Sequence, residues 1–89
     1  VLLFEDEMPG DSLRKLCDAV ASVCGGRCAV FAGAEGAYKY AIGHMGGDLR
    51  ALTKQLNAEL SGRGGGKPHF VQGSVSCRRA DIETFFTRN

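Results

Sequence analysis

The sequence predicts a mixed α/β (α+β) domain in which helices pack on one β-sheet, with the element order β-α-β-β-α-β-α. Short apolar runs of strand length alternate with longer segments whose apolar residues recur every three or four positions. A short turn at residues 33–36 joins two strand-like segments, which predicts an antiparallel hairpin. Two strand–helix–strand crossovers flank this hairpin, so we expect a sheet with both parallel and antiparallel neighbours.

The first half of the chain begins with an apolar run, residues 1–4, which predicts a buried strand. Asp11 or Ser12 is placed to cap the helix that follows, and Gly25-Gly26 to end it. The apolar stripe of that helix consists of Leu13, Leu16, Cys17, Val20 and Cys24. Residues 27–32 are again nearly all apolar and predict the second strand.

The second half of the chain begins with a predicted strand that is followed by a predicted helix. Tyr38, Tyr40 and Ile42 alternate with smaller or charged residues, as in a half-buried strand. Asp48 is placed to cap the next helix, and Gly62 to end it. The buried stripe of this helix consists of Leu49, Leu52, Leu56 and Leu60.

The C-terminal part of the chain predicts one more strand and one short helix. The strand covers residues 70–75 and the helix begins near Arg79. Ile82, Phe85 and Phe86 are expected to pack this helix against the sheet.

Size and charge limit the classes of function. The chain has 89 residues, 44% of them hydrophobic and 24% charged, as expected for one folded domain over residues 1–89. Its net charge of +1 means that any nucleic-acid role must rest on a local basic patch. No apolar run approaches the roughly 20 residues of a membrane span. Because the chain does not begin with Met and opens within a strand, we expect a domain excised from a longer, cytoplasmic protein.

The cysteines and the catalytic residue types give little sign of chemistry. Cys17, Cys24, Cys28 and Cys77 have no C-x-x-C spacing, so we expect reduced, mostly buried thiols and no metal site. No sequence pattern of a nucleophile with its base, or of a metal-dependent hydrolase, is present. We therefore predict no catalytic residues in this chain.

The glycine run is the most informative local feature. Three consecutive glycines, Gly64, Gly65 and Gly66, lie between Arg63 and Lys67 at a predicted helix-to-strand junction. Such a loop lets backbone N–H groups approach an anion, and the flanking cations favour phosphate. A merely flexible or tight connection stays open as the alternative. Dinucleotide and Walker loops lie at strand-to-helix junctions, so the run is neither of these.

Other candidate contacts lie beyond the glycine run. His69 stands beside Phe70, where it would stack on a base or cover the sheet. Arg78 and Arg79 follow the last predicted strand, and we expect them to converge with Arg63 and Lys67 into one basic patch.

The segment GRGGGKPHFVQGS, residues 62–74, resembles the hallmark of the DHH-associated C-terminal domain, first subtype. That domain occurs at the C-terminus of alanyl-tRNA synthetases and of long alanyl-tRNA editing proteins, and related copies end DHH phosphoesterases. In the phosphoesterase branch a histidine follows the three glycines, whereas Lys67 stands there in this chain. The departure favours the alanyl-tRNA branch, and the resemblance covers essentially the whole chain.

The resemblance implies a tRNA-binding accessory domain with tRNA(Ala) as partner. The parent would be an alanyl-tRNA deacylase or an alanine–tRNA ligase, whose editing chemistry requires zinc in a separate domain. This chain lacks that ligand pattern, so it is expected to bind no cofactor and to be inactive alone. A homodimer, a pure dimerisation role and the phosphate-binding half of a nucleotide phosphoesterase stay open. The residues expected to contact nucleic acid or phosphate are Arg63, Gly64, Gly65, Gly66, Lys67, His69, Gln72, Gly73, Arg78 and Arg79.

Overall fold

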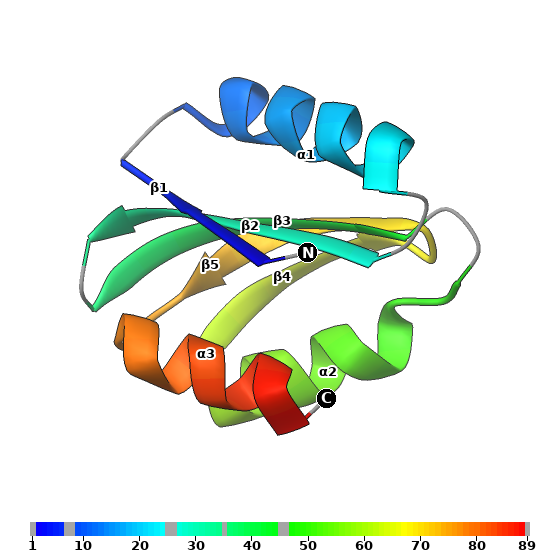
Figure 1. Cartoon of the computed structure of the whole chain (residues 1–89). Helices are drawn as coiled ribbons and strands as arrows, with labels where there is room; N and C mark the ends of the chain where they lie inside the picture. The colour runs from blue at the N-terminus through cyan, green and yellow to red at the C-terminus, as the bar shows by residue number, and fades with distance from the viewer. Residues whose placement is uncertain (1, 7–8, 25–26, 35, 45–46, 89) are drawn as a thin grey trace.

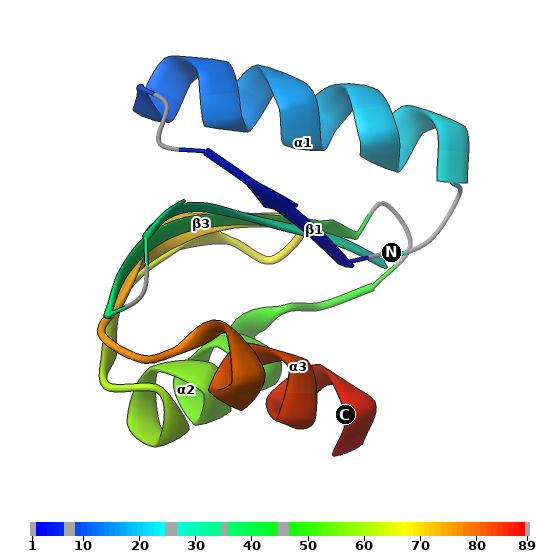
Figure 2. The same ribbon diagram turned by 60° about the vertical axis from the view of Figure 1, so that its left-hand side comes forward.

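In the computed structural model, which describes residues 2–6, 9–24, 27–34, 36–44 and 47–88, one sheet is covered by helices on both faces (Figure 1). The elements of this part of the chain are β1 Leu2–Glu5, α1 Gly10–Cys24, β2 Arg27–Ala34, β3 Ala37–His44, α2 Arg50–Glu59, β4 Gly62–Lys67, β5 Phe70–Val75 and α3 Arg79–Arg88. α1 covers one face, and α2 and α3 lie together on the other (Figure 2). The predicted mixed fold class is confirmed.

The sheet has the strand order β1-β2-β3-β5-β4. β1 and β2 are parallel, and the remaining neighbours are antiparallel. The prediction of a loop over the glycine run is wrong, because residues 62–67 form the edge strand β4. This extra reversal turns β5 antiparallel to β3, so only the first crossover joins parallel neighbours. Glycines carry no alternating side chains, and the sequence pattern therefore gives no sign of the strand.

The helix ends differ in detail from the prediction. α1 begins at Gly10, where the Leu13 N–H donates to the Pro9 carbonyl at 3.0 Å. Asp11 therefore lies within the first turn, where its charge faces the positive end of the helix dipole. α2 ends through Ser61, whose φ of 51° takes the left-handed conformation that usually falls to glycine. Gly62 already belongs to β4.

Two buried clusters form the core, one on each face of the sheet. The cluster under α1 consists of Leu13, Cys17, Ala21, Cys28, Val30, Ala32 and Ala41. The cluster under α2 and α3 is larger and contains Phe31, Tyr40, Ile42, Leu56, Ile82 and Phe85 among others. The inward packing predicted for α3 is thus confirmed, with Ile82 and Phe85 fully buried and Phe86 packed against them.

The thiols agree with the sequence prediction where they are described. Cys17, Cys28 and Cys77 are reduced thiols, and the first two are buried. Burial raises the pKa of the Cys17 thiol to about 12. The side chain of Cys24, and the predicted roles of Val1 and of Gly25-Gly26, lie outside the described residues. None of the helices in the described ranges has the length and apolar character needed to cross a membrane.

Candidate nucleic-acid interface

β4 is an edge strand whose residues 63–67 are all exposed. It pairs on one side only, with β5, so that Arg63 lies opposite Ser74 and Lys67 opposite Phe70. Its other side carries no strand of the described chain. The backbone of the three glycines and the side chains of Arg63 and Lys67 are therefore all exposed to solvent.

Two glycines of this hairpin are required by the fold. Gly64 and Gly73 are register partners, and Tyr40 is the next partner of Gly73 in β3. A Cβ atom would lie 2.7 Å from the Tyr40 hydroxyl oxygen at Gly64 and 2.8 Å from it at Gly73. Gly64 also has φ of 148°, a backbone conformation that residues other than glycine rarely adopt. The Tyr40 hydroxyl thus lies where the side chains of residues 64 and 73 would otherwise be.

The other two glycines of the run differ from each other. A Cβ atom at Gly66 would lie 2.6 Å from the Phe70 carbonyl oxygen. At Gly65 a Cβ atom would meet nothing within 4 Å, and its backbone conformation is not restricted to glycine. The domain itself therefore does not require glycine at position 65.

A short hydrogen-bond chain ties α2 to this edge of the sheet. The Tyr40 hydroxyl donates to the Asn57 side-chain oxygen at 3.1 Å, and the Asn57 amide donates to the Gly64 carbonyl at 3.2 Å. Burial raises the pKa of Tyr40, so the phenol stays a protonated donor at neutral pH. Asn57 thus links the buried Tyr40 hydroxyl to the backbone of β4.

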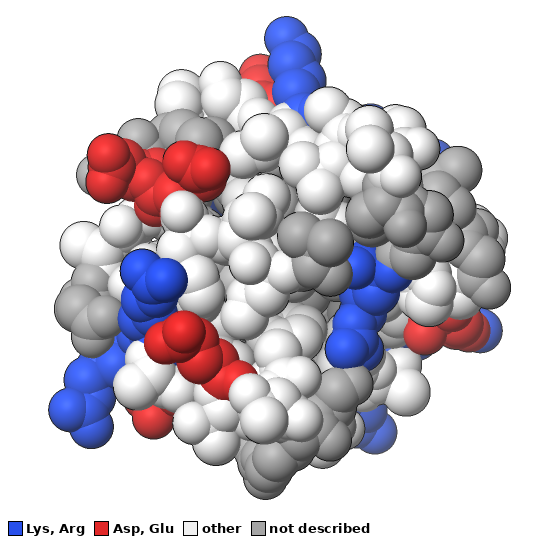
Figure 3. Space-filling view, viewed as in Figure 1, with Lys and Arg blue, Asp and Glu red and all other residues white. Residues whose placement is uncertain are grey.

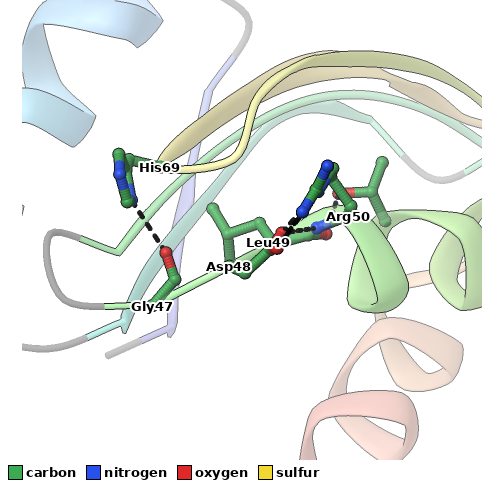
Figure 4. Close-up of polar contacts among 6 residues, drawn as sticks. Gly47, Asp48, Leu49, Arg50 and His69 are labelled. Atoms are coloured by element: carbon green, nitrogen blue, oxygen red, sulfur yellow. Dashed lines mark hydrogen bonds and ion pairs between the residues drawn. The ribbon is translucent and has the colours of Figure 1, made fainter.

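The tip of the β4–β5 hairpin is fastened to the loop before α2 (Figure 4). His69 Nδ1 donates to the Gly47 carbonyl at 2.8 Å. The Pro68 carbonyl accepts from the Leu49 N–H at 2.7 Å, and the His69 carbonyl accepts from the His44 N–H at 3.0 Å. The exposed His69 ring is therefore held by the loop, and covering of the sheet, one of its two predicted roles, does not describe it.

Asp48 and Arg50 form an exposed ion pair at the start of α2 (Figure 4). The prediction that Asp48 caps α2 is wrong, because the N-cap position belongs to Leu49 and Asp48 lies one residue before it. The Asp48 carboxylate instead accepts from the backbone N–H of Arg50, the first residue of the helix, at 3.0 Å. It also accepts from the guanidinium at 2.6 Å. These hydrogen bonds lower the pKa of Asp48 to about 2. Part of the positive charge of Arg50 is thereby neutralised.

β4 separates two hollows. The α2-side hollow, of about 250 Å³, is lined by Arg50, Thr53, Lys54, Asn57, Gly64, Gly65, Gly66 and Val71. The α1-side hollow, of about 400 Å³, is lined by Arg14, Asp18, Gly65, Gly66, Lys67, Phe70 and Gln72. The Arg14 guanidinium lies 5.7 Å from the centre of the Phe70 ring, which holds this cation over β5. Each hollow thus combines two cations with exposed glycine backbone.

The predicted site residues do not all come together. The hairpin gathers Arg63, the three glycines, Lys67, His69, Gln72 and Gly73. The convergence predicted for Arg79 is wrong, because its guanidinium lies 4.2 Å from the Phe4 ring centre in β1, at the opposite edge of the sheet. Arg78 stands just before α3, and its N–H donates to Asp81. The neighbouring Cys77 carbonyl accepts from Gly36 in the β2–β3 turn, which places this segment away from the hairpin tip.

Sequence reasoning missed three cations of the site, Arg14, Arg50 and Lys54. A signal for two of them was present, because Arg50, Lys54 and Asn57 recur at helical spacing and share one face of α2. Arg14 offers no such signal, because its place depends on how α1 crosses the sheet. Among the described residues no group of three His, Cys, Asp or Glu side chains is arranged to hold a metal ion.

The opposite side of the molecule has a different charge distribution. Figure 3 views it as in Figure 1, with β1 in front of the other strands. Among the described residues on this face, basic and acidic side chains are scattered around a largely uncharged centre. The cations that flank bare backbone are those that line the two hollows beside β4.

The comparisons with known proteins support one fold. No protein-family model and no curated protein matches the sequence. Eight chains of solved structures match. One is the crystal structure of the C-Ala domain of alanyl-tRNA synthetase from Aquifex aeolicus, with a TM-score of 0.78 and 16% sequence identity. The match covers 98% of this chain and 85% of the C-Ala chain, so the two share their fold over nearly the full domain.

Proposed function

We propose that this chain is a tRNA-binding accessory domain of an alanyl-tRNA editing protein or an alanyl-tRNA synthetase. One observation carries the proposal: cations from α1, α2 and β4 surround the exposed glycine strand in two adjoining hollows. Phosphate groups are the nucleic-acid component that such an arrangement binds. The fold shared with a C-Ala domain and the resemblance of residues 62–74 favour tRNA(Ala) over other nucleic acids.

Under the same proposal, catalysis and tRNA binding belong to different domains of the parent protein. Deacylation, with its zinc, belongs to a separate editing domain, and this cytoplasmic module contributes affinity for the tRNA body. Incubating the isolated chain with mischarged tRNA(Ala) should leave the aminoacyl ester to its spontaneous decay. Release of the amino acid that depends on this chain would contradict the assignment.

A salt series of tRNA binding tests the interface. The wild type is compared with Arg63→Ala and Lys67→Ala, which remove exposed cations of β4. Each lost phosphate contact reduces the salt slope by about 1. Between 50 and 200 mM salt, the loss of affinity should therefore be about fourfold smaller in each variant than in the wild type.

Arg79→Gln is the charge-matched control. Arg79 lies at the β1 edge, and glutamine keeps part of the stem that packs on Phe4. Its salt slope should equal that of the wild type, with thermal unfolding confirming an intact fold. Unchanged affinity and slope in both β4 variants would remove the glycine strand from the tRNA interface. Self-association would then be the better account of the domain.

A further inference from the structure

β4 is a common wall between two basic hollows. Gly65 and Gly66 line both of them. Arg14 and Lys67 border the hollow on the α1 side, and Arg50 and Lys54 the one on the α2 side. The two helices lie on opposite faces of the sheet (Figure 1), so positive charge flanks this strand from both sides.

The wall is thin because most of β4 has no side chains. Packed sheets lie about 10 Å apart with their side chains between them, so a bare backbone strand is about half as thick. Gly65 contributes to this thinness although the fold has room for a side chain there. A partner that must come close on both faces gives position 65 a reason to be glycine.

The charge pattern selects the partner. A strand as thin as β4, with cations on both of its faces, fits between two rows of negative charge. A-form RNA has a deep, narrow major groove bordered by the phosphates of both strands, and side chains cannot read the bases inside it. A single strand or an acidic peptide offers only one such row.

We propose that β4 enters the major groove of double-helical RNA edge-on. The α1-side cations then contact the phosphates of one strand and the α2-side cations those of the other. This inference rests on the proposed tRNA-binding function and names the RNA element that the same surface recognises. Because no base-reading side chain stands on the glycines, recognition follows helix shape rather than sequence.

Two lysines are the cleanest probes. Asp48 pairs with Arg50, and Asp18 lies in the α1-side hollow together with Arg14. Lys54 and Lys67 are exposed, and neither forms an ion pair with another described residue. Lys54→Ala therefore tests the α2 face, and Lys67→Ala tests the α1 face.

The experiment measures binding of the 89-residue chain to an RNA duplex of about 16 base pairs, the span of a double-stranded RNA-binding domain. One strand of the same sequence and intact tRNA are measured in parallel. Each lysine variant should lower the duplex salt slope by about 1, and the double variant by about 2. If Lys67→Ala lowers the slope and Lys54→Ala does not, groove insertion is overturned while tRNA binding survives. If even tRNA is not bound, the proposed function itself fails.

Gly65→Leu tests insertion independently of charge. Because a Cβ atom at position 65 meets no protein atom within 4 Å and residue 65 is exposed, this variant should fold with a melting temperature close to that of the wild type. It should nevertheless lose binding to the duplex, since the leucine makes β4 too thick to enter the groove. Ala80→Leu, at an exposed position of α3, is the matched control and should bind as the wild type does. Full duplex binding by Gly65→Leu would refute the proposal.

Discussion

Gly73→Ala and Gly65→Ala make the same chemical change in one hairpin, and the structure predicts opposite effects on stability. A Cβ atom at Gly73 would collide with the Arg63 carbonyl oxygen and lie 2.7 Å from the Gly64 Cα atom. Both obstacles are backbone atoms held by the β4–β5 pairing, so neither can move without breaking that pairing. A third obstacle, the Tyr40 hydroxyl oxygen at 2.8 Å, belongs to a fully buried side chain.

The size of the effect follows from these contacts. Overpacking costs about 1–3 kcal/mol, and the upper end applies here because the obstacles are rigid. A loss of about 3 kcal/mol corresponds to a melting temperature lowered by about 12–24 °C in a domain of this size. Gly65→Ala meets no neighbour and reduces only the entropy of the unfolded chain, so it should stabilise by about 0.4–1 kcal/mol.

Urea unfolding followed by far-ultraviolet circular dichroism measures both variants against the wild type. With a total stability of about 4–13 kcal/mol for 89 residues, Gly73→Ala should still fold. Equal changes in the two variants, or a Gly65→Ala variant as unstable as Gly73→Ala, would refute this account of the glycines.

Three further outcomes are expected. Burial raises the pKa of Cys17 from 9.0 to about 12, so the folded state binds this proton more tightly than the unfolded state. The contribution of Cys17 to the free energy of unfolding is therefore fully present below about pH 9 and is lost as the pH rises toward 12. Urea unfolding at a series of pH values should show a weaker pH dependence in Cys17→Ala. Arg50 lowers the pKa of Asp48 from 3.8 to about 2, so the small contribution of this ion pair to stability is present above pH 3.8 and is lost as the pH falls through 2. Nuclear magnetic resonance titration of the Asp48 carboxyl should give a midpoint near 2, and Arg50→Ala should return this midpoint toward 3.8. Tyr40→Phe removes the hydrogen bond to Asn57 and should cost about 1 kcal/mol in urea unfolding with the fold retained, whereas an unchanged midpoint would show that the bond contributes nothing.

The sequence predicted those elements whose buried residues carry a period. The helical spacing of Leu13 and Cys17 placed α1, and alternation from Tyr38 to Ile42 placed β3. Both patterns arise because one face of each element is buried while the other is solvated. The ends of helices were less certain, since termination depends on backbone conformation, as the positive φ of Ser61 shows.

β4 could not be predicted from periodicity, because glycines have no side chains and so cannot show the alternation of apolar and polar residues that marks a strand. One local signal was available: Lys67-Pro68-His69-Phe70 places proline at the second position of a turn between two pairing segments. The site was predictable where it lies within one hairpin. The positions of Arg14 and Arg79 depend on how α1 and α3 cross the sheet, which no short-range pattern encodes.

The attachment of the hairpin tip to the loop before α2 has a consequence for local unfolding. The N–H groups of His44 and Leu49 donate to carbonyls of residues more than 15 positions further along the chain. Their exchange with deuterated solvent therefore requires the tip at Pro68 and His69 to detach, even if β3 and α2 stay intact. These two amides should exchange together and at a rate set by opening of the tip. They thus provide a built-in probe of how often the glycine edge moves as a unit.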